Sequence, residues 1–76
     1  MNNQRRKQIT KIINDLRSSE DDIQGILEEE QEAFDNIPEG LLESERAEQS
    51  QNAIELLDDA INSLEEAINN LEEAQE

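Results

Sequence analysis

Isoleucine recurs every seven residues from Ile54 onward, and leucine recurs with the same period three residues later. The stretch reads AIELLDD, AINSLEE and AINNLEE, so an alanine precedes each isoleucine. Apolar residues at heptad positions a and d lie along one side of a helix. The repeat therefore predicts a long helix over about residues 42–75. Its predicted core face consists of Ile54, Leu57, Ile61, Leu64, Ile68 and Leu71.

A second amphipathic segment covers about residues 3–36, where apolar residues are separated mainly by three, four or seven positions. This spacing predicts another helix. Gly25 costs a helix about 1 kcal/mol relative to alanine. Ser18 and Ser19 resemble helix caps, because an acidic residue follows each of them by three positions. We nevertheless expect one continuous helix, because the apolar stripe keeps its phase across these residues.

The two segments are separated by a turn at residues 36–41. Pro38 cannot continue a helix interior and disfavours helical geometry at the residue before it. Asn36 is a good N-cap with Glu39 three residues later, which is compatible with Pro38 in the first turn of the second helix. Gly40 and Ser44 weaken that start, and we expect the helix to be secure from Glu45. A short link between helices of nearly equal length predicts an antiparallel hairpin. We therefore expect an all-α fold in which residues 1–76 form one coiled-coil-like helical hairpin.

The apolar surface is wider than a seam between two helices requires. With Ile9 at position a, the first helix is apolar at a, d and e, and the second is apolar at a, d and g. A two-helix seam needs only a and d. We expect the spare flanks to be covered by a second copy, so that a homodimer completes a four-helix bundle. These flanks are Ile13, Leu27 and Phe34 on the first helix and Ala53, Ala60, Ala67 and Ala74 on the second.

Charge is unevenly distributed in this chain of net charge −15. Residues 18–76 carry twenty acidic side chains and only one basic side chain, Arg46. Such a surface repels nucleic acid and anionic lipid and attracts basic protein surfaces. Residues 1–17 carry Arg5, Arg6, Lys7, Lys11 and Arg17 against Asp15. We expect these cations to neutralise the acidic end of the second helix.

Several residue types that carry chemistry are absent. Without cysteine or histidine, the chain has no disulfide framework, no thiolate metal site and no Glu-x-x-His di-iron motif. It also lacks a Ser-His or Cys-His pair and a phosphate-binding glycine loop. We expect no catalytic residue, no cofactor and no metal ion, and hence a protein that is not an enzyme. The longest apolar run is two residues, too short to span a membrane, so we expect a cytoplasmic protein.

Acidic residues repeat in columns along both predicted helices. Carboxylates seven residues apart are separated by about 10 Å along a helix, so a column of them can imitate the row of charges on a nucleic acid backbone. The alternative is a solvated face that only keeps the protein soluble. Ordinary exposed helices intersperse both signs to gain i,i+4 pairs, and this chain does not, which favours a functional surface. The candidate partner-binding residues are Asp21, Asp22, Glu28, Glu29, Asp58, Asp59, Glu65 and Glu66.

Residues 28–74 resemble a group of small acidic helical proteins encoded by bacteriophages and prophages. The shared features are EEEQEA, then DN-x-P-E, then SER-x-E, and then the AI-x-x-L repeat. The resemblance implies an early or accessory phage protein that acts in the cytoplasm of the bacterial host. Small acidic phage proteins frequently inhibit host enzymes that handle nucleic acid, sometimes by occupying the DNA-binding surface. No functional residues follow from this resemblance.

Two functions are compatible with these patterns. In the first, a non-enzymatic phage protein binds a host protein through a basic, nucleic-acid-binding surface and occludes it, as an anti-defence inhibitor would. Its partner is then a host protein, with no direct contact to nucleic acid or membrane. In the second, the chain is a structural or assembly coiled-coil module whose apolar faces mediate oligomerisation. In that case the acidic residues serve only solubility.

Overall fold

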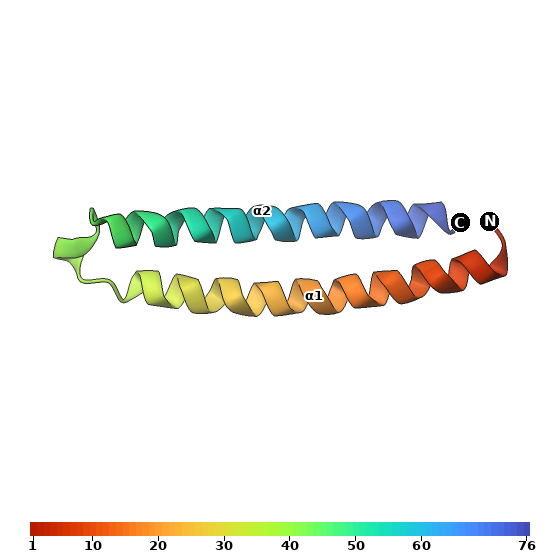
Figure 1. Ribbon diagram of the computed structural model, residues 1–76, viewed down its shortest axis with the longest axis horizontal. Helices are drawn as coiled ribbons and strands as arrows, with labels where there is room; N and C mark the ends of the chain where they lie inside the picture. Colours follow the sequence, from red (N-terminus) through yellow and green to blue (C-terminus); the bar gives the residue numbers. More distant parts are fainter.

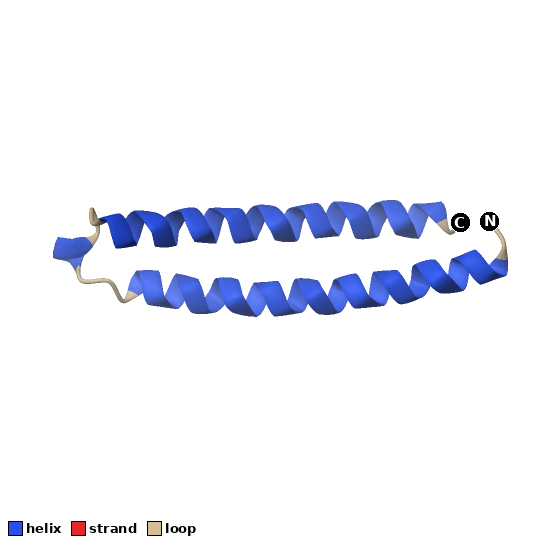
Figure 2. Ribbon diagram, viewed as in Figure 1, coloured by secondary structure: helices blue, strands red, loops and turns tan.

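The chain folds into a hairpin of two long antiparallel helices in the computed structural model, which describes residues 1–76 (Figure 1). Helix α1 covers Asn3–Asp35, the short 3-10 helix η1 covers Glu39–Leu41, and helix α2 covers Glu45–Ala74. No strand is present (Figure 2). The Cα trace extends over 59 × 15 × 12 Å, and both termini lie at the same end of the rod. The predicted all-helical fold, with two helices packed against each other, is confirmed.

Helix α1 is continuous from its first turn to its last. It begins after Asn2, whose side-chain oxygen accepts a hydrogen bond from the backbone N–H three residues later, at 2.8 Å. It passes through residues 18–25 without a break, so the serine pair and Gly25 do not interrupt it. It ends at Asp35, and the N–H of Asn36 donates to the carbonyl oxygen of Glu32 at 3.1 Å.

The turn differs in detail from the expected one. Asn36 closes α1 instead of capping the second helix. Pro38 has an extended backbone (φ −56°, ψ 141°), which takes the chain out of helical geometry before η1. Helix α2 begins only at Glu45, where the hydroxyl of Ser44 accepts a hydrogen bond from the N–H of Ala47 at 3.3 Å. Serine is a favoured N-cap, and this cap replaces the predicted one near residue 36.

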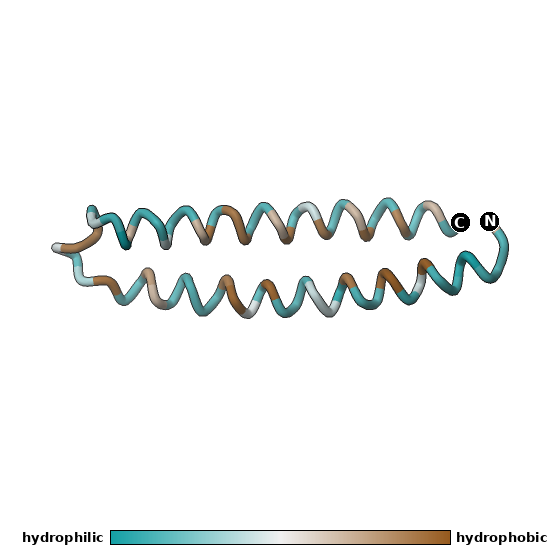
Figure 3. Tube along the Cα trace, viewed as in Figure 1, coloured by the Kyte–Doolittle hydropathy of each residue, from teal (hydrophilic) through white to brown (hydrophobic).

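The core face predicted for α2 lies against α1. Ile61 and Ile68 are buried, as is Ala47 one turn from the start of the helix. The other core residues, Ile54, Leu57, Leu64 and Leu71, are partly buried. In Figure 3 the hydrophobic segments of both helices recur along the trace with the helical period. Neither helix combines the length and the hydropathy that a membrane span requires.

Helix α1 packs with a different side from the one that the sequence suggested. We expected Ile13 and Leu27 to lie on a spare flank, together with Phe34. Instead Ile13 is buried and the other two are partly buried. The exposed flank is the neighbouring column, in which Ile12 is 48% and Ile26 is 54% exposed.

The reason for this choice is the size of the side chains in the two columns. Leu27 and Phe34 belong to the packed column, and Ile26 and Ala33 occupy the corresponding places in the exposed one. Because burial stabilises in proportion to apolar area, the column that contains phenylalanine gains more than the column that contains alanine. The chain therefore buries the bulkier of two adjacent apolar columns.

One polar residue on the packed side of α1 has a hydrogen-bond partner across the seam. Glu30 interrupts the apolar stripe of α1 and is partly buried. The hydroxyl of Ser50 on α2 donates a hydrogen bond to its Oε1 at 2.7 Å. A buried polar group costs little when it is hydrogen-bonded, so the pair lets the seam continue toward the turn.

The core of this hairpin is thin. Only four of the 76 residues are buried, namely Ile13, Ala47, Ile61 and Ile68. The molecule exposes 5858 Å², which is about 1,100 Å² more than a compact monomer of 8.7 kDa is expected to expose. Its stability therefore depends on a single line of contacts between the two helices.

Replacing one buried side chain should measure that dependence. Ile61 is 6% exposed, so Ile61→Ala should lower the free energy of unfolding by about 2 kcal/mol or more, which is seen as a lower Tm by circular dichroism. The control is Gln51→Ala on the same helix, where the side chain is exposed and the effect should stay within about 0.5 kcal/mol. Equal effects of the two substitutions would contradict the observed seam.

Gly25 offers a test of helix continuity. A methyl group added there would meet no atom within 4 Å, and no residue of the chain has a positive φ. Gly25→Ala should therefore stabilise the protein by about 1 kcal/mol, because alanine is the better helix former. Gly40→Ala has equally open surroundings but lies in η1, so its gain should be smaller. A destabilising Gly25→Ala would indicate that α1 bends at this residue.

Candidate functional site

All eight residues of the predicted partner-binding set are exposed, and we call them the acidic surface: Asp21, Asp22, Glu28, Glu29, Asp58, Asp59, Glu65 and Glu66. None of them forms a salt bridge. An exposed carboxylate without a cationic neighbour keeps its negative charge available to a partner. The acidic surface is therefore not neutralised by the chain's own basic residues.

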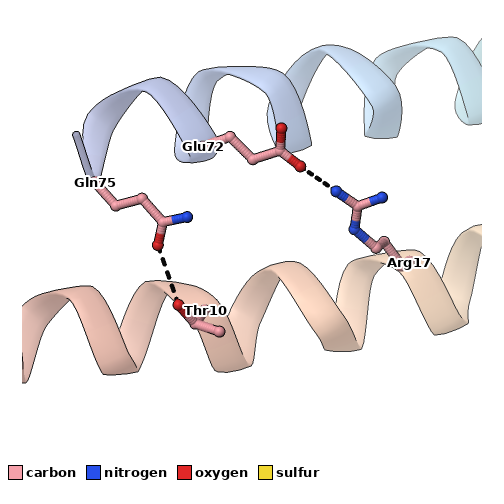
Figure 4. A network of polar contacts seen from close by, with 4 residues as sticks. All are labelled: Thr10, Arg17, Glu72 and Gln75. Atoms are coloured by element: carbon pink, nitrogen blue, oxygen red, sulfur yellow. Dashed lines mark hydrogen bonds and ion pairs between the residues drawn. The ribbon is translucent and has the colours of Figure 1, made fainter.

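The basic residues are occupied elsewhere or remain free. Lys11 Nζ lies 3.2 Å from Asp15 Oδ2, one turn away on the same helix. Arg17 on α1 forms an ion pair with Glu72 on α2 (Figure 4). These are the two salt bridges of the molecule, and in both the side chains are largely exposed. Exposed ion pairs of this kind contribute about 0–1 kcal/mol each.

The terminal end is held by a small polar network around Gln75. Thr10 Oγ1 donates a hydrogen bond to Gln75 Oε1 at 3.1 Å (Figure 4), and Arg6 Nε donates to the carbonyl oxygen of Gln75 at 2.9 Å. Gln75 is the C-cap of α2, so the Arg6 guanidinium lies at the negative end of that helix dipole. Arg5 and Lys7 form no ion pair. Among the cations of residues 1–17, Arg6 therefore contacts α2 through the carbonyl oxygen of Gln75, and Arg17 contacts it through the carboxylate of Glu72.

The acidic surface does not form one continuous face. On α2, Asp59 and Glu66 belong to the column that points away from α1, and Glu65 lies beside the seam next to Glu20. On α1, Asp21 lies one turn beyond Arg17 and so shares its side of the hairpin. Asp22 lies one turn before Ile26, on the opposite side. The sequence identified exposed acidic residues, but their columns point in several directions around the rod.

One acidic contact was missed by the sequence reasoning. Glu20 of α1 and Glu65 of α2 lie close together across the seam and line the same shallow hollow. Glu20 is partly buried. Its signal in the sequence was an acidic residue in an otherwise apolar column, but the residue that it meets is 45 positions away. Helix periodicity alone does not identify such a contact.

The surroundings of Glu20 change its acidity. Loss of solvent between the helices raises the pKa of Glu20 above its usual range, and the negative charges of Glu65 and Asp21 raise it further. Arg17 opposes this shift but does not cancel it. The raised pKa means that deprotonating Glu20 works against the folded hairpin.

The carboxylates do not converge on one point. No group of three or more acidic side chains is placed so that it could hold a metal ion. The arrangement consists of separated charges on a narrow rod.

No known protein family, curated protein sequence or solved structure matches this chain.

The Glu20–Glu65 contact predicts an unusual pH dependence. A carboxyl group whose pKa is raised in the folded state stabilises that state below its ordinary pKa, and the contribution is lost as pH rises through the raised value. Glu20→Gln removes the ionisation, so it should raise the Tm at pH 7 and change it little near pH 4. Thermal denaturation followed by circular dichroism at several pH values measures this.

The matched control is Glu32→Gln, because Glu32 is an exposed glutamate on the same helix and has no neighbour across the seam. Glu32→Gln changes the net charge of the protein by the same amount as Glu20→Gln. If the two variants change the dependence of Tm on pH equally, general charge repulsion explains the effect and the Glu20–Glu65 contact does not.

Proposed function

We propose that this chain is a non-enzymatic acidic protein, encoded by a phage, that binds a host protein through a basic, nucleic-acid-binding surface and occludes it. The observation that carries the proposal is that none of the eight residues of the acidic surface has an ion-pair partner in the chain. The sequence resemblance to small acidic phage proteins supplies the context, the cytoplasm of a bacterial host. Inhibition of a defence protein is the form of activity that this context favours.

The density of charge along the rod supports a nucleic-acid mimic. A net charge of −15 over 59 Å gives one negative charge per about 4 Å, whereas one strand of DNA has one per about 3.4 Å. Because the acidic columns point in several directions, a groove along one side of the rod would meet part of these charges, at a wider spacing than on a strand. Complementary charge speeds association and makes it sensitive to salt. The mechanism is competition for the groove, with no chemical step.

Affinity capture from bacterial lysate tests the proposal. The immobilised protein should enrich a nucleic-acid-handling protein at low salt and lose most of it at high salt, as measured by mass spectrometry. Neutralising four residues of the acidic surface (Asp58→Asn, Asp59→Asn, Glu65→Gln and Glu66→Gln) should reduce the enrichment at least tenfold. A control variant that neutralises four exposed acids near the turn should reduce it much less. These acids are Glu39, Glu43, Glu45 and Glu48. If no such protein is enriched at low salt, the proposal is wrong.

A structural or assembly role is the second candidate. The half-exposed side chains of Ile12 and Ile26 favour it, because they give the hairpin an apolar surface that a partner helix could cover. The same neutralised variant separates the two functions. An assembly module keeps its partner when the acidic surface is neutralised, whereas an inhibitor of the proposed kind loses its target.

A further inference from the structure

One side of the hairpin carries an apolar face that nothing in the molecule covers. The contacts between Thr10 and Gln75 and between Glu20 and Glu65 show which residues of the two helices lie at the same position along the rod, which we call the same height. Both contacts, with Arg17–Glu72, mark one side of the seam. By helix periodicity, the Ile12 column and the alanine column of α2 flank the seam on the opposite side. We call this the apolar face: Ile12, Ser19, Ile26 and Ala33 on α1, with Ala53, Ala60, Ala67 and Ala74 on α2.

The apolar face contains no charged residue, although 36% of the chain is charged. Each residue of its α1 column lies at the height of an alanine on α2, so Ile12 is level with Ala74 and Ile26 with Ala60. Ile12 and Ile26 are about half exposed. Exposed apolar side chains on a side without charge favour an interaction surface over a solvated face.

The hairpin exposes about 1,100 Å² more surface than a compact monomer of its mass. A second copy along one side of the rod would remove part of this surplus from water. A homodimer needs a surface that is complementary to itself. Isoleucine on α1 and alanine on α2 at two of the four heights provide this, because a large side chain of one copy there faces a small one of the other.

The two edges of the apolar face decide how a second copy lies on it. The edge along α1 is acidic, with Asp15, Asp22 and Glu29. The edge along α2 is uncharged, with Gln49, Leu56, Ser63 and Asn70. A two-fold axis parallel to the rod places the acidic edge of each copy on the uncharged edge of the other. A two-fold axis across the rod places acidic edge on acidic edge, where contacts closer than the screening length of about 8 Å are repulsive.

We propose that two copies pair through the apolar face, side by side with their turns at the same end, so that each α1 packs against the partner's α2. In this four-helix bundle every helix has two antiparallel neighbours, which also aligns the helix dipoles favourably. Ile26 then lies beside the partner's Ala60, and Ile12 beside the partner's Ala74. The pairing leaves Asp59 and Glu66 on the outside. It does not depend on the proposed function.

Sedimentation equilibrium of the full chain tests the pairing. The wild type should form dimers, and Ile26→Glu should raise the dissociation constant at least tenfold. The control is Gln24→Glu, which adds the same charge to the same helix at an exposed position on the other side of the seam. It should raise the dissociation constant less than twofold. A wild type that stays monomeric at millimolar concentration overturns the proposal, and so do equal effects of the two variants.

A distance measurement tests the direction and does not require a destabilised variant. The chain has no cysteine, so Glu43→Cys gives a single spin-label site near the turn. Packed helices lie 8–10 Å apart, so the two labels of the proposed dimer should be within roughly 30 Å by pulsed electron resonance. Copies paired in the opposite direction would place the labels near the full rod length of 59 Å, which would overturn the proposed arrangement.

Discussion

The structure depends on one narrow line of apolar contacts between two antiparallel helices. A hairpin of this length has no second layer, and only four residues are buried. Helices of this size gain most of their stability from packing an amphipathic face, because intrinsic propensity alone is marginal. Every other feature follows from how the helices turn toward each other. That rotation decides which apolar column is covered and which acidic columns point outward.

Negative charge works against this line of contacts. Acidic side chains repeat along both helices, and only Asp15 and Glu72 form salt bridges. Glu20 and Glu65 lie close together across the seam. Like charges at helical spacing destabilise by a few tenths of a kcal/mol per pair. A sequence selected only for stability would intersperse lysine and arginine on these surfaces. Uncompensated carboxylates on so thin a core lower its stability, and this cost is the physical argument for the proposed binding role.

Periodicity was enough to predict both helices, the turn between them and the packed face of α2. It was not enough for α1, because Ile12 and Ile13, and again Ile26 and Leu27, are adjacent apolar residues. Because the stripe is two columns wide, α1 could turn either column toward α2, and packing against α2 determines which one is buried. The second helix was predicted to begin near residue 42, whereas α2 begins at Glu45. Asn36 and Ser44 are both good N-caps, and the sequence alone does not show which of them caps α2. For the candidate site, exposure could be predicted from each helix alone, whereas the Glu20–Glu65 contact depends on the mutual rotation of the two.

The contacts across the seam also imply an order of assembly. Glu30 and Ser50, beside the turn, are 20 residues apart, while Arg17 and Glu72 are 55 apart and Arg6 and Gln75 are 69 apart. Closing a short loop costs less entropy than closing a long one, and topologies rich in local contacts fold fast. The hairpin should therefore close like a zipper from the turn toward the free ends. Thermal fraying runs in reverse and opens the ends of the chain first.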